Sequence, residues 1–79
     1  MAISAVQIFI YSDDFITLGQ FLKAANLAQS GGEAKIMLSS GGIMVNDNSE
    51  TRRGRKLRSG DTVRFGHQTW QLQSAAQTV

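Results

Sequence analysis

Two helix-start signatures of the same form stand in the first half of the chain and limit what it can fold into. Thr17 is followed three residues later by Gln20, and Ser30 by Glu33. This is the capping-box pattern, in which the two side chains satisfy free backbone N–H groups at a helix start. Apolar residues then recur at the spacing of one helix face: Leu18, Phe21, Leu22 and Ala25 after the first signature, and Ala34, Met37 and Leu38 after the second. The sequence therefore predicts two short helices, over residues 17–26 and from residue 30 to the glycines at 41 and 42, that pack as a hairpin.

Alternating side chains predict a strand near the N-terminus, over residues 6–11. Val6, Ile8 and Ile10 fall on one face, and the aromatic Phe9 and Tyr11 fall on the other. Both faces carry bulky groups, so the strand is either covered on both sides or leaves its aromatic rings exposed. Exposed rings can stack on bases, but simple packing of the strand is the favoured interpretation.

A second alternating segment, over residues 62–72, predicts a β-hairpin. Gly66-His67 supplies a two-residue connection with glycine first, which suits a type II′ turn. In that register Val63 pairs with Trp70 on an apolar face. A short strand at Ile43 to Val45 and a turn over 46–48 precede the hairpin, since Asn and Asp tolerate left-handed backbone.

Composition limits the class of protein. Seventy-nine residues with 42% hydrophobic content suffice for one small domain with a modest core. The absence of Cys excludes a disulfide and a thiolate zinc site. No apolar run reaches the length of a membrane span, and the N-terminus lacks the positive start of a signal peptide. The sequence predicts one cytoplasmic α+β domain over residues 1–79: two packed helices, a small, mainly antiparallel sheet, a basic loop and a frayed tail at 74–79.

The basic loop is the main functional signal. Residues 51–60 contain five of the chain's eight Lys and Arg residues and no acid, so the remainder holds three basic residues against six acidic ones. Such asymmetry indicates a polyanionic partner. The alternative is a solvated, disordered loop without a partner. The five basic residues are Arg52, Arg53, Arg55, Lys56 and Arg58.

The start of the second predicted helix is a further candidate. Gly31 and Gly32 leave backbone N–H groups unshielded at the positive end of the helix dipole, where a phosphate can approach, and Lys35 follows one turn later. By itself this pattern is better explained by glycines that allow tight packing. The spacing of a nucleotide P-loop is absent.

Catalysis has little support in the sequence. His67 is the only histidine, there is no cysteine to pair with it, and no nucleophile-elbow pattern occurs. His67 is expected at a hairpin tip without a catalytic role. A protein-interaction adaptor that uses the strand at 6–11 or the basic loop stays open as an alternative.

The spacing of residues between 30 and 46 resembles the RNA-binding domain of small-subunit ribosomal protein S-four, also called the alpha-L motif. The positions that carry the resemblance are Ser30, Ala34, Met37, Leu38, Gly41, Ile43, Val45 and Asn46, with Leu18, Phe21, Leu22 and Leu27 before them and Gly60, Asp61 and Val63 after them. The motif core covers about 17–65. The chain is especially similar to the small stand-alone YaaA/YbcJ-like branch, through the segments 16–23, 31–32 and 52–57.

This resemblance implies binding of structured RNA, with ribosomal RNA or the ribosome as the usual setting, and no catalysis. We expect a monomer without cofactor, metal, membrane or small-molecule partner. Many family members have Arg directly after the opening Ser, where this chain has Gly31, and Gly where this chain has Asp47. The first difference removes a charge from the RNA-facing helix. We therefore expect the basic loop and the backbone amides to contribute relatively more to binding.

Overall fold

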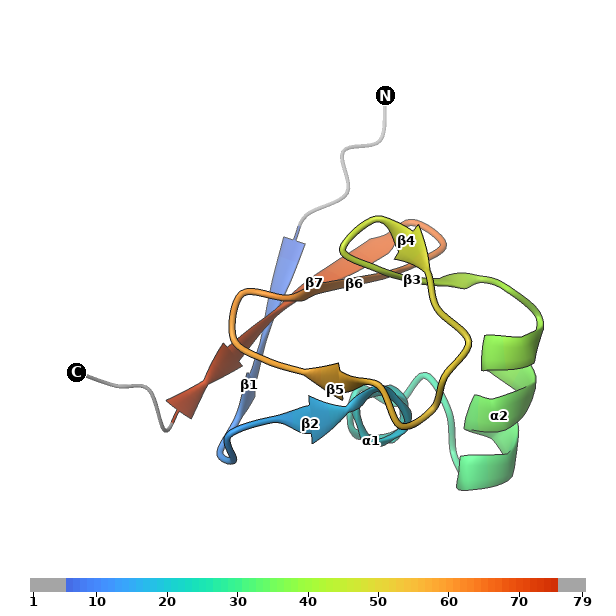
Figure 1. Ribbon diagram of the computed structural model, residues 1–79, viewed down its shortest axis with the longest axis horizontal. Helices are drawn as coiled ribbons and strands as arrows, with labels where there is room; N and C mark the ends of the chain where they lie inside the picture. The colour runs from blue at the N-terminus through green and yellow to red at the C-terminus, as the bar shows by residue number, and fades with distance from the viewer. Residues whose placement is uncertain (1–5, 76–79) are drawn as a thin grey trace.

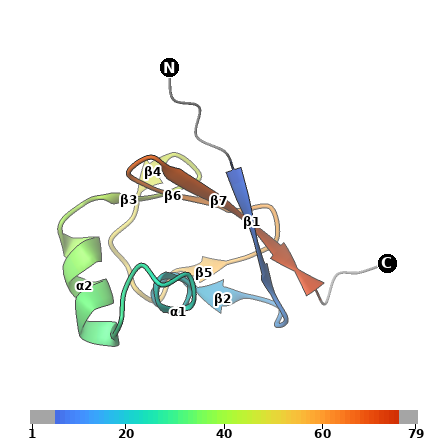
Figure 2. The same ribbon diagram turned by 180° about the vertical axis from the view of Figure 1, so that it is seen from behind.

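The computed structural model describes residues 6–75 and confirms an α+β fold (Figure 1). Its elements follow one another in this order: β1 Val6–Tyr11, β2 Ile16–Thr17, α1 Leu18–Ala24, α2 Gly31–Ser39, β3 Ile43–Val45, β4 Asn48–Ser49, β5 Lys56–Leu57, β6 Thr62–Phe65 and β7 Gln68–Ser74. Both helices lie on one side of the larger sheet, as the view from behind shows (Figure 2).

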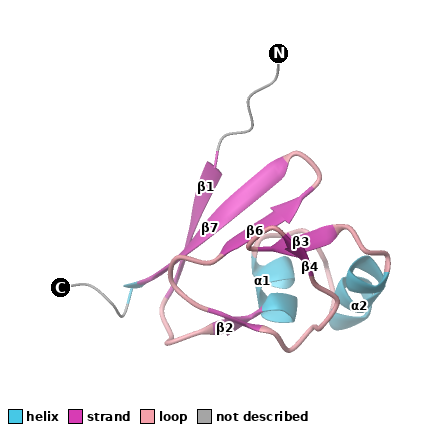
Figure 3. Cartoon of the chain, turned by 45° about the horizontal axis from the view of Figure 1, so that its top comes forward, coloured by secondary structure: helices cyan, strands magenta, loops and turns pink. Residues whose placement is uncertain are grey.

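The larger sheet has five strands in the order β1-β7-β6-β3-β4. The pairs β7·β6, β6·β3 and β3·β4 are antiparallel, whereas β1 runs parallel to β7 with Val6 opposite Thr69. The sheet is therefore mixed, with the mainly antiparallel character that the sequence predicts. β2 and β5 form a separate two-stranded antiparallel sheet beside α1 (Figure 3).

The predicted hairpin is present in the predicted register. Val63 lies opposite Trp70, and Gly66 in the connection has a φ of 62°, which glycine adopts without strain. The prediction of a frayed tail from Ser74 is wrong at its start, because Ser74 is buried as the last residue of β7. Its hydroxyl donates a hydrogen bond to the Asp13 carbonyl (2.9 Å). Residues 76–79 lie outside the described part of the chain.

Both helices begin at the predicted caps. Thr17 and Gln20 form a full capping box at α1. At α2 the Ser30 hydroxyl accepts a hydrogen bond from the Glu33 N–H (3.1 Å), but the Glu33 carboxylate accepts from the Gln29 N–H (2.8 Å) instead of from Ser30. The α2 start therefore differs from a full capping box, because the Glu33 side chain accepts from the residue before the N-cap. This contact still satisfies a free backbone N–H before the helix.

The core lies between the sheet and the helices. Phe21 of α1 stands at its centre, edge-on to Phe9 (ring centroids 5.0 Å apart) and to Trp70 (5.6 Å). Buried apolar side chains surround these rings: Tyr11, Leu18, Leu22, Ala28, Ala34, Leu38, Ile43, Val45, Leu57, Val63 and Leu72.

Strand β1 is covered on one face only. Phe9 packs against the core and Tyr11 is buried, so the aromatic rings take no part in an exposed stacking surface. The opposite face is open: Val6, Ile8 and Ile10 are 56%, 53% and 61% exposed. Covering on both sides, one of the two alternatives left by the sequence, therefore does not occur, and neither does exposure of the rings.

Candidate nucleic-acid interface

The backbone of the basic loop is fixed to α1. The Leu18 N–H donates to the Arg55 carbonyl (2.8 Å), and the Gly19 N–H donates to the Arg53 carbonyl (2.9 Å). These loop carbonyls satisfy donors that the first turn of a helix leaves free. The loop then continues into β5, where Leu57 is completely buried. The loop is therefore ordered over the region where the arginines lie, which differs from the solvated, disordered alternative.

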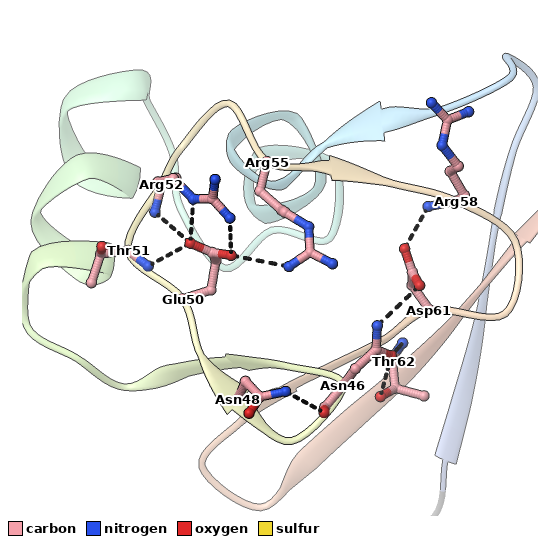
Figure 4. A network of polar contacts seen from close by, with 9 residues as sticks. All are labelled: Asn46, Asn48, Glu50, Thr51, Arg52, Arg55, Arg58, Asp61 and Thr62. Atoms are coloured by element: carbon pink, nitrogen blue, oxygen red, sulfur yellow. Dashed lines mark hydrogen bonds and ion pairs between the residues drawn. The ribbon is translucent and has the colours of Figure 1, made fainter.

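A buried carboxylate organises one end of the loop. Glu50 accepts hydrogen bonds from the backbone N–H groups of Thr51 and Arg52 (both 3.1 Å), as Figure 4 shows. It also pairs with the guanidinium groups of Arg52 and Arg55, each with a shortest distance of 3.0 Å. Two of the five loop cations are therefore partly neutralised and held in place. Sequence reasoning missed Glu50, whose one signal was its position directly before the basic run.

The partners of Glu50 lower the pKa of its carboxyl group from 4.5 to about 2. The hydrogen bond from the Arg52 side chain is the largest cause, followed by the bond from the Arg52 N–H, and burial opposes both. In return, Glu50 raises the pKa of the Arg52 guanidinium. The carboxylate therefore remains ionised at every pH at which the protein can be expected to work.

Glu50→Gln should lower the free energy of unfolding at pH 7 by roughly 1–3 kcal/mol, allowing for the exposure of Arg52. Because the folded pKa lies below the unfolded one, the stabilisation is complete above about pH 4.5 and is lost as the pH falls toward 2. Urea unfolding at pH 7 and pH 3 should show a smaller difference between the two values for Glu50→Gln than for the parent. Asp47→Asn, the same charge change at an exposed turn, is the control. An unaltered pH dependence in Glu50→Gln would contradict this role.

The other end of the loop is held by Asn46 and Asp61. The Asn46 side chain donates to the Asp61 carboxylate (3.0 Å) and accepts from the Thr62 N–H (2.9 Å). The second carboxylate oxygen of Asp61 accepts from the Arg58 N–H (2.8 Å; Figure 4). Asn46 and Asp47 have positive φ values of 50° and 68°, as the predicted turn requires. The β3–β4 turn is thereby connected directly to the end of the loop.

Lys56 and Arg58 both lie over the half-buried ring of Phe15. The Lys56 ammonium lies 4.9 Å from the centroid of the Phe15 ring, and the Arg58 guanidinium carbon lies 5.7 Å from it. Both contacts are within the range of cation–π attraction. The two residues are two apart along β5 and its extension, so their side chains leave the backbone on the same side.

Arg53 is separate from both groups and faces the helices. It lines a hollow of about 330 Å³ between α1, α2 and the loop, together with Thr17, Gly19, Gln20, Lys23, Gly31, Ala34 and Gly54. The structure thus brings together two of the predicted site residues, Arg53 and Gly31. Gly32 and Lys35 are exposed on α2 and do not line the hollow.

Lys23 is the one charged lining residue that sequence reasoning did not assign to the site. Its position off the apolar stripe of α1 predicts an exposed side chain, and the structure confirms this. Nothing local in the sequence connects it with Arg53, because the contact between α1 and the loop spans distant positions. The five basic residues of the loop thus fall into three places: the pair on Glu50, the pair on Phe15, and Arg53 in the hollow. Of the other candidates, Gly31 lines the hollow, and Gly32 and Lys35 are exposed on α2 outside it.

Among residues 6–75, no group of three or more His, Asp or Glu side chains is placed to hold a metal ion. No helix in the described part of the chain is long and apolar enough to cross a membrane.

The class of protein is defined by an alpha-L fold that carries an ordered basic surface. The family comparison agrees, since the chain belongs to the S4 domain family, with a match over residues 8–73. This confirms the resemblance seen in the sequence. Over 50 residues the chain is 58% identical to the probable ribosome maturation protein RlbA of Bacillus subtilis (strain 168). The aligned region covers 63% of this chain and 70% of that protein. Neither match indicates a catalytic family.

Proposed function

We propose that this protein is a non-catalytic, monomeric cytoplasmic module that binds structured RNA, most directly ribosomal RNA or a ribosomal particle. The observation that carries the proposal is the ordered basic loop, whose cations are held against α1, α2 and Phe15. The S4 domain match and the name of the Bacillus subtilis relative, a probable ribosome maturation protein, support the ribosomal setting. No cofactor, membrane or small-molecule substrate is part of the proposal.

Phosphate neutralisation is the proposed basis of binding. Arg outnumbers Lys in the loop, and its planar fork suits bidentate contacts with phosphate. Folded RNA is recognised largely through its shape, its phosphates and the 2′-hydroxyl groups. The proposed contact residues are Gly31, Gly32, Lys35, Arg52, Arg53, Arg55, Lys56 and Arg58. Because Glu50 offsets part of the charge of Arg52 and Arg55, we expect three or four of the five loop cations to reach RNA.

Ultraviolet crosslinking in cells, followed by sequencing of the bound RNA, tests the ribosomal setting. We expect crosslinked fragments to concentrate in a few structured segments of ribosomal RNA. Most of this signal should disappear in a variant with Arg52→Ala and Arg53→Ala at an equal protein level. Crosslinks spread in proportion to RNA abundance, unchanged in the double variant, would contradict the proposal.

The open aliphatic face of β1 favours one alternative, an adaptor that binds protein without touching RNA. Val6, Ile8 and Ile10 lie side by side on the uncovered face of an edge strand, and such exposed apolar patches commonly mark interaction sites. Purified protein and purified RNA decide between the two. Salt-sensitive binding with no other protein present supports the RNA-binding module, and its absence supports the adaptor.

A further inference from the structure

Arg53 packs closely against Gly19, and only glycine leaves room for this contact, which we call the Arg53 seat. A Cβ atom placed on Gly19 would lie 2.5 Å from the Arg53 Cγ, closer than non-bonded carbon atoms approach, and 3.3 Å from both the Arg53 Cδ and the Arg53 carbonyl oxygen, which is a tight contact. Gly19 is buried in α1, and its N–H donates to the Arg53 carbonyl (2.9 Å). Backbone and side chain of Arg53 are therefore both placed against the same residue.

The far end of the Arg53 side chain reaches the start of α2. A Cβ atom on Gly31 would lie 3.8 Å from the Arg53 Nη1, so the guanidinium stands beside the first residue of α2. A loop residue thus supplies positive charge beside a helix start that has none in its first turn. Lys23 of α1 lines the same hollow from another side.

The lining of the hollow favours an anion. It contains two cations and no acidic side chain, and the Gln20 side-chain oxygen is already engaged by the Thr17 N–H (3.0 Å). Its volume of about 330 Å³ is at the lower end of ligand pockets and exceeds what a phosphate group alone fills.

We propose that this hollow is a discrete site for one backbone phosphate of the bound RNA, with Lys23 and Arg53 as its cations and Gly19 as the positioning residue that seats Arg53. The inference rests on the proposed RNA-binding function and adds Lys23 and Gly19 to it. It explains why Gly19 occurs inside a helix, where glycine is otherwise unfavourable.

A double-mutant cycle of Gly19→Ala and Arg53→Ala, measured by thermal unfolding, tests the Arg53 seat in the absence of RNA. Ala normally stabilises a helix relative to Gly, but in the parent Gly19→Ala forces the Arg53 side chain out. In the Arg53→Ala background the side-chain obstacle is gone, and only the backbone carbonyl of residue 53 remains close to the added Cβ, at 3.3 Å. The change in melting temperature caused by Gly19→Ala should therefore be more favourable in that background, by about 4 °C or more. Equal changes in the two backgrounds would overturn the seat.

Filter binding to a structured ribosomal RNA fragment tests the phosphate site. At 0.1 M salt, Lys23→Gln and Gly19→Ala should each weaken binding by about fivefold, and Lys23→Gln should make the slope of log K against log salt shallower by about 0.7–0.9. Gly19→Ala should add little to the loss caused by Arg53→Ala. Arg64→Gln is the matched control, since it removes the same charge from an exposed position on the sheet. It should stay within about twofold of the parent, because a distant charge contributes weakly through screened salt solution.

The outcomes separate the two proposals. If the parent binds and loses affinity on loop substitution, but Lys23→Gln and Gly19→Ala behave like Arg64→Gln, the phosphate site is wrong and the RNA-binding function stands. If the parent does not bind structured RNA, both proposals fail, although the thermal cycle still reports on the seat. Loss of binding in Lys23→Gln at an unchanged salt slope would also overturn the phosphate site.

Discussion

Leu22→Ala or Leu38→Ala should lower the free energy of unfolding by about 2–4 kcal/mol. Leu22 of α1 is 0% exposed and Leu38 of α2 is 1% exposed, and both belong to the cluster between the helices and the sheet. Truncation removes buried carbon atoms and leaves a cavity that the surrounding side chains fill only in part. In a domain of this size such a loss is a large share of the total stability. Urea unfolding followed by circular dichroism provides the measurement.

Ile36→Ala is the matched control for this prediction. Ile36 lies on α2 two residues before Leu38 and is 67% exposed, so its truncation removes a similar side chain from the other face of the same helix. We expect a change within about 0.5 kcal/mol. Losses below that value for Leu22→Ala and Leu38→Ala, or a loss for Ile36→Ala as large as theirs, would show that the helices bury different faces.

Local chemistry explains why so much of the fold could be predicted. The Thr17 and Ser30 caps, the apolar spacing behind them and the Gly66-His67 turn each act within a few residues, so a single sequence displays them. The left-handed conformations of Asn46 and Asp47 follow for the same reason. These features set the two helices and the register of the β6–β7 hairpin, and the structure confirms them.

The parts that escaped prediction depend on contacts between distant positions. The parallel pairing of β1 with β7 joins the two ends of the chain, and nothing within residues 6–11 indicates that partner. The two-residue strands β2 and β5 are too short for alternation to reveal. Likewise, the sequence shows that aliphatic and aromatic side chains lie on opposite faces of β1. Only the position of Phe21 decides that the face with Phe9 turns inward.

The candidate site shows the same division. The cluster of basic residues is visible in composition, because it depends only on counting charges. Their arrangement is not, since Glu50, Phe15 and Gly19 divide the five cations into three differently oriented groups. Asn46 and Asp61 match positions of the alpha-L motif, and the hydrogen bond between them accounts physically for those two residue types.

Combined Arg52→Ala and Arg53→Ala substitutions should produce the largest loss of RNA binding. The Arg52 side chain is 73% exposed, and Arg53 stands beside the start of α2, so each is placed to meet a different part of a phosphate backbone. Each neutralised phosphate contributes about −0.7 to −0.9 to the slope of log K against log salt. With three or four loop contacts, the parent should show a slope of roughly −2 to −4.

Two matched changes place limits on this effect. Lys35→Ala, at an exposed position of α2, should weaken binding to a smaller extent than the double substitution. His67→Ala at the hairpin tip should have little effect. Circular dichroism must show that each variant is folded, since Arg52 is also a partner of Glu50. Arg55 retains its ion pair with Glu50 in the double variant, which should keep the loop in place.

Filter binding of the parent and the double variant to a structured ribosomal RNA fragment, across a salt series, tests the central claim most directly. An RNA-binding surface on the basic loop predicts binding weakened by roughly 5- to 30-fold at 0.1 M salt and a slope shallower by about one to two units. A folded double variant that binds as tightly as the parent, with an unchanged slope, would contradict it and leave the S4 domain match as a statement about fold and not about the site.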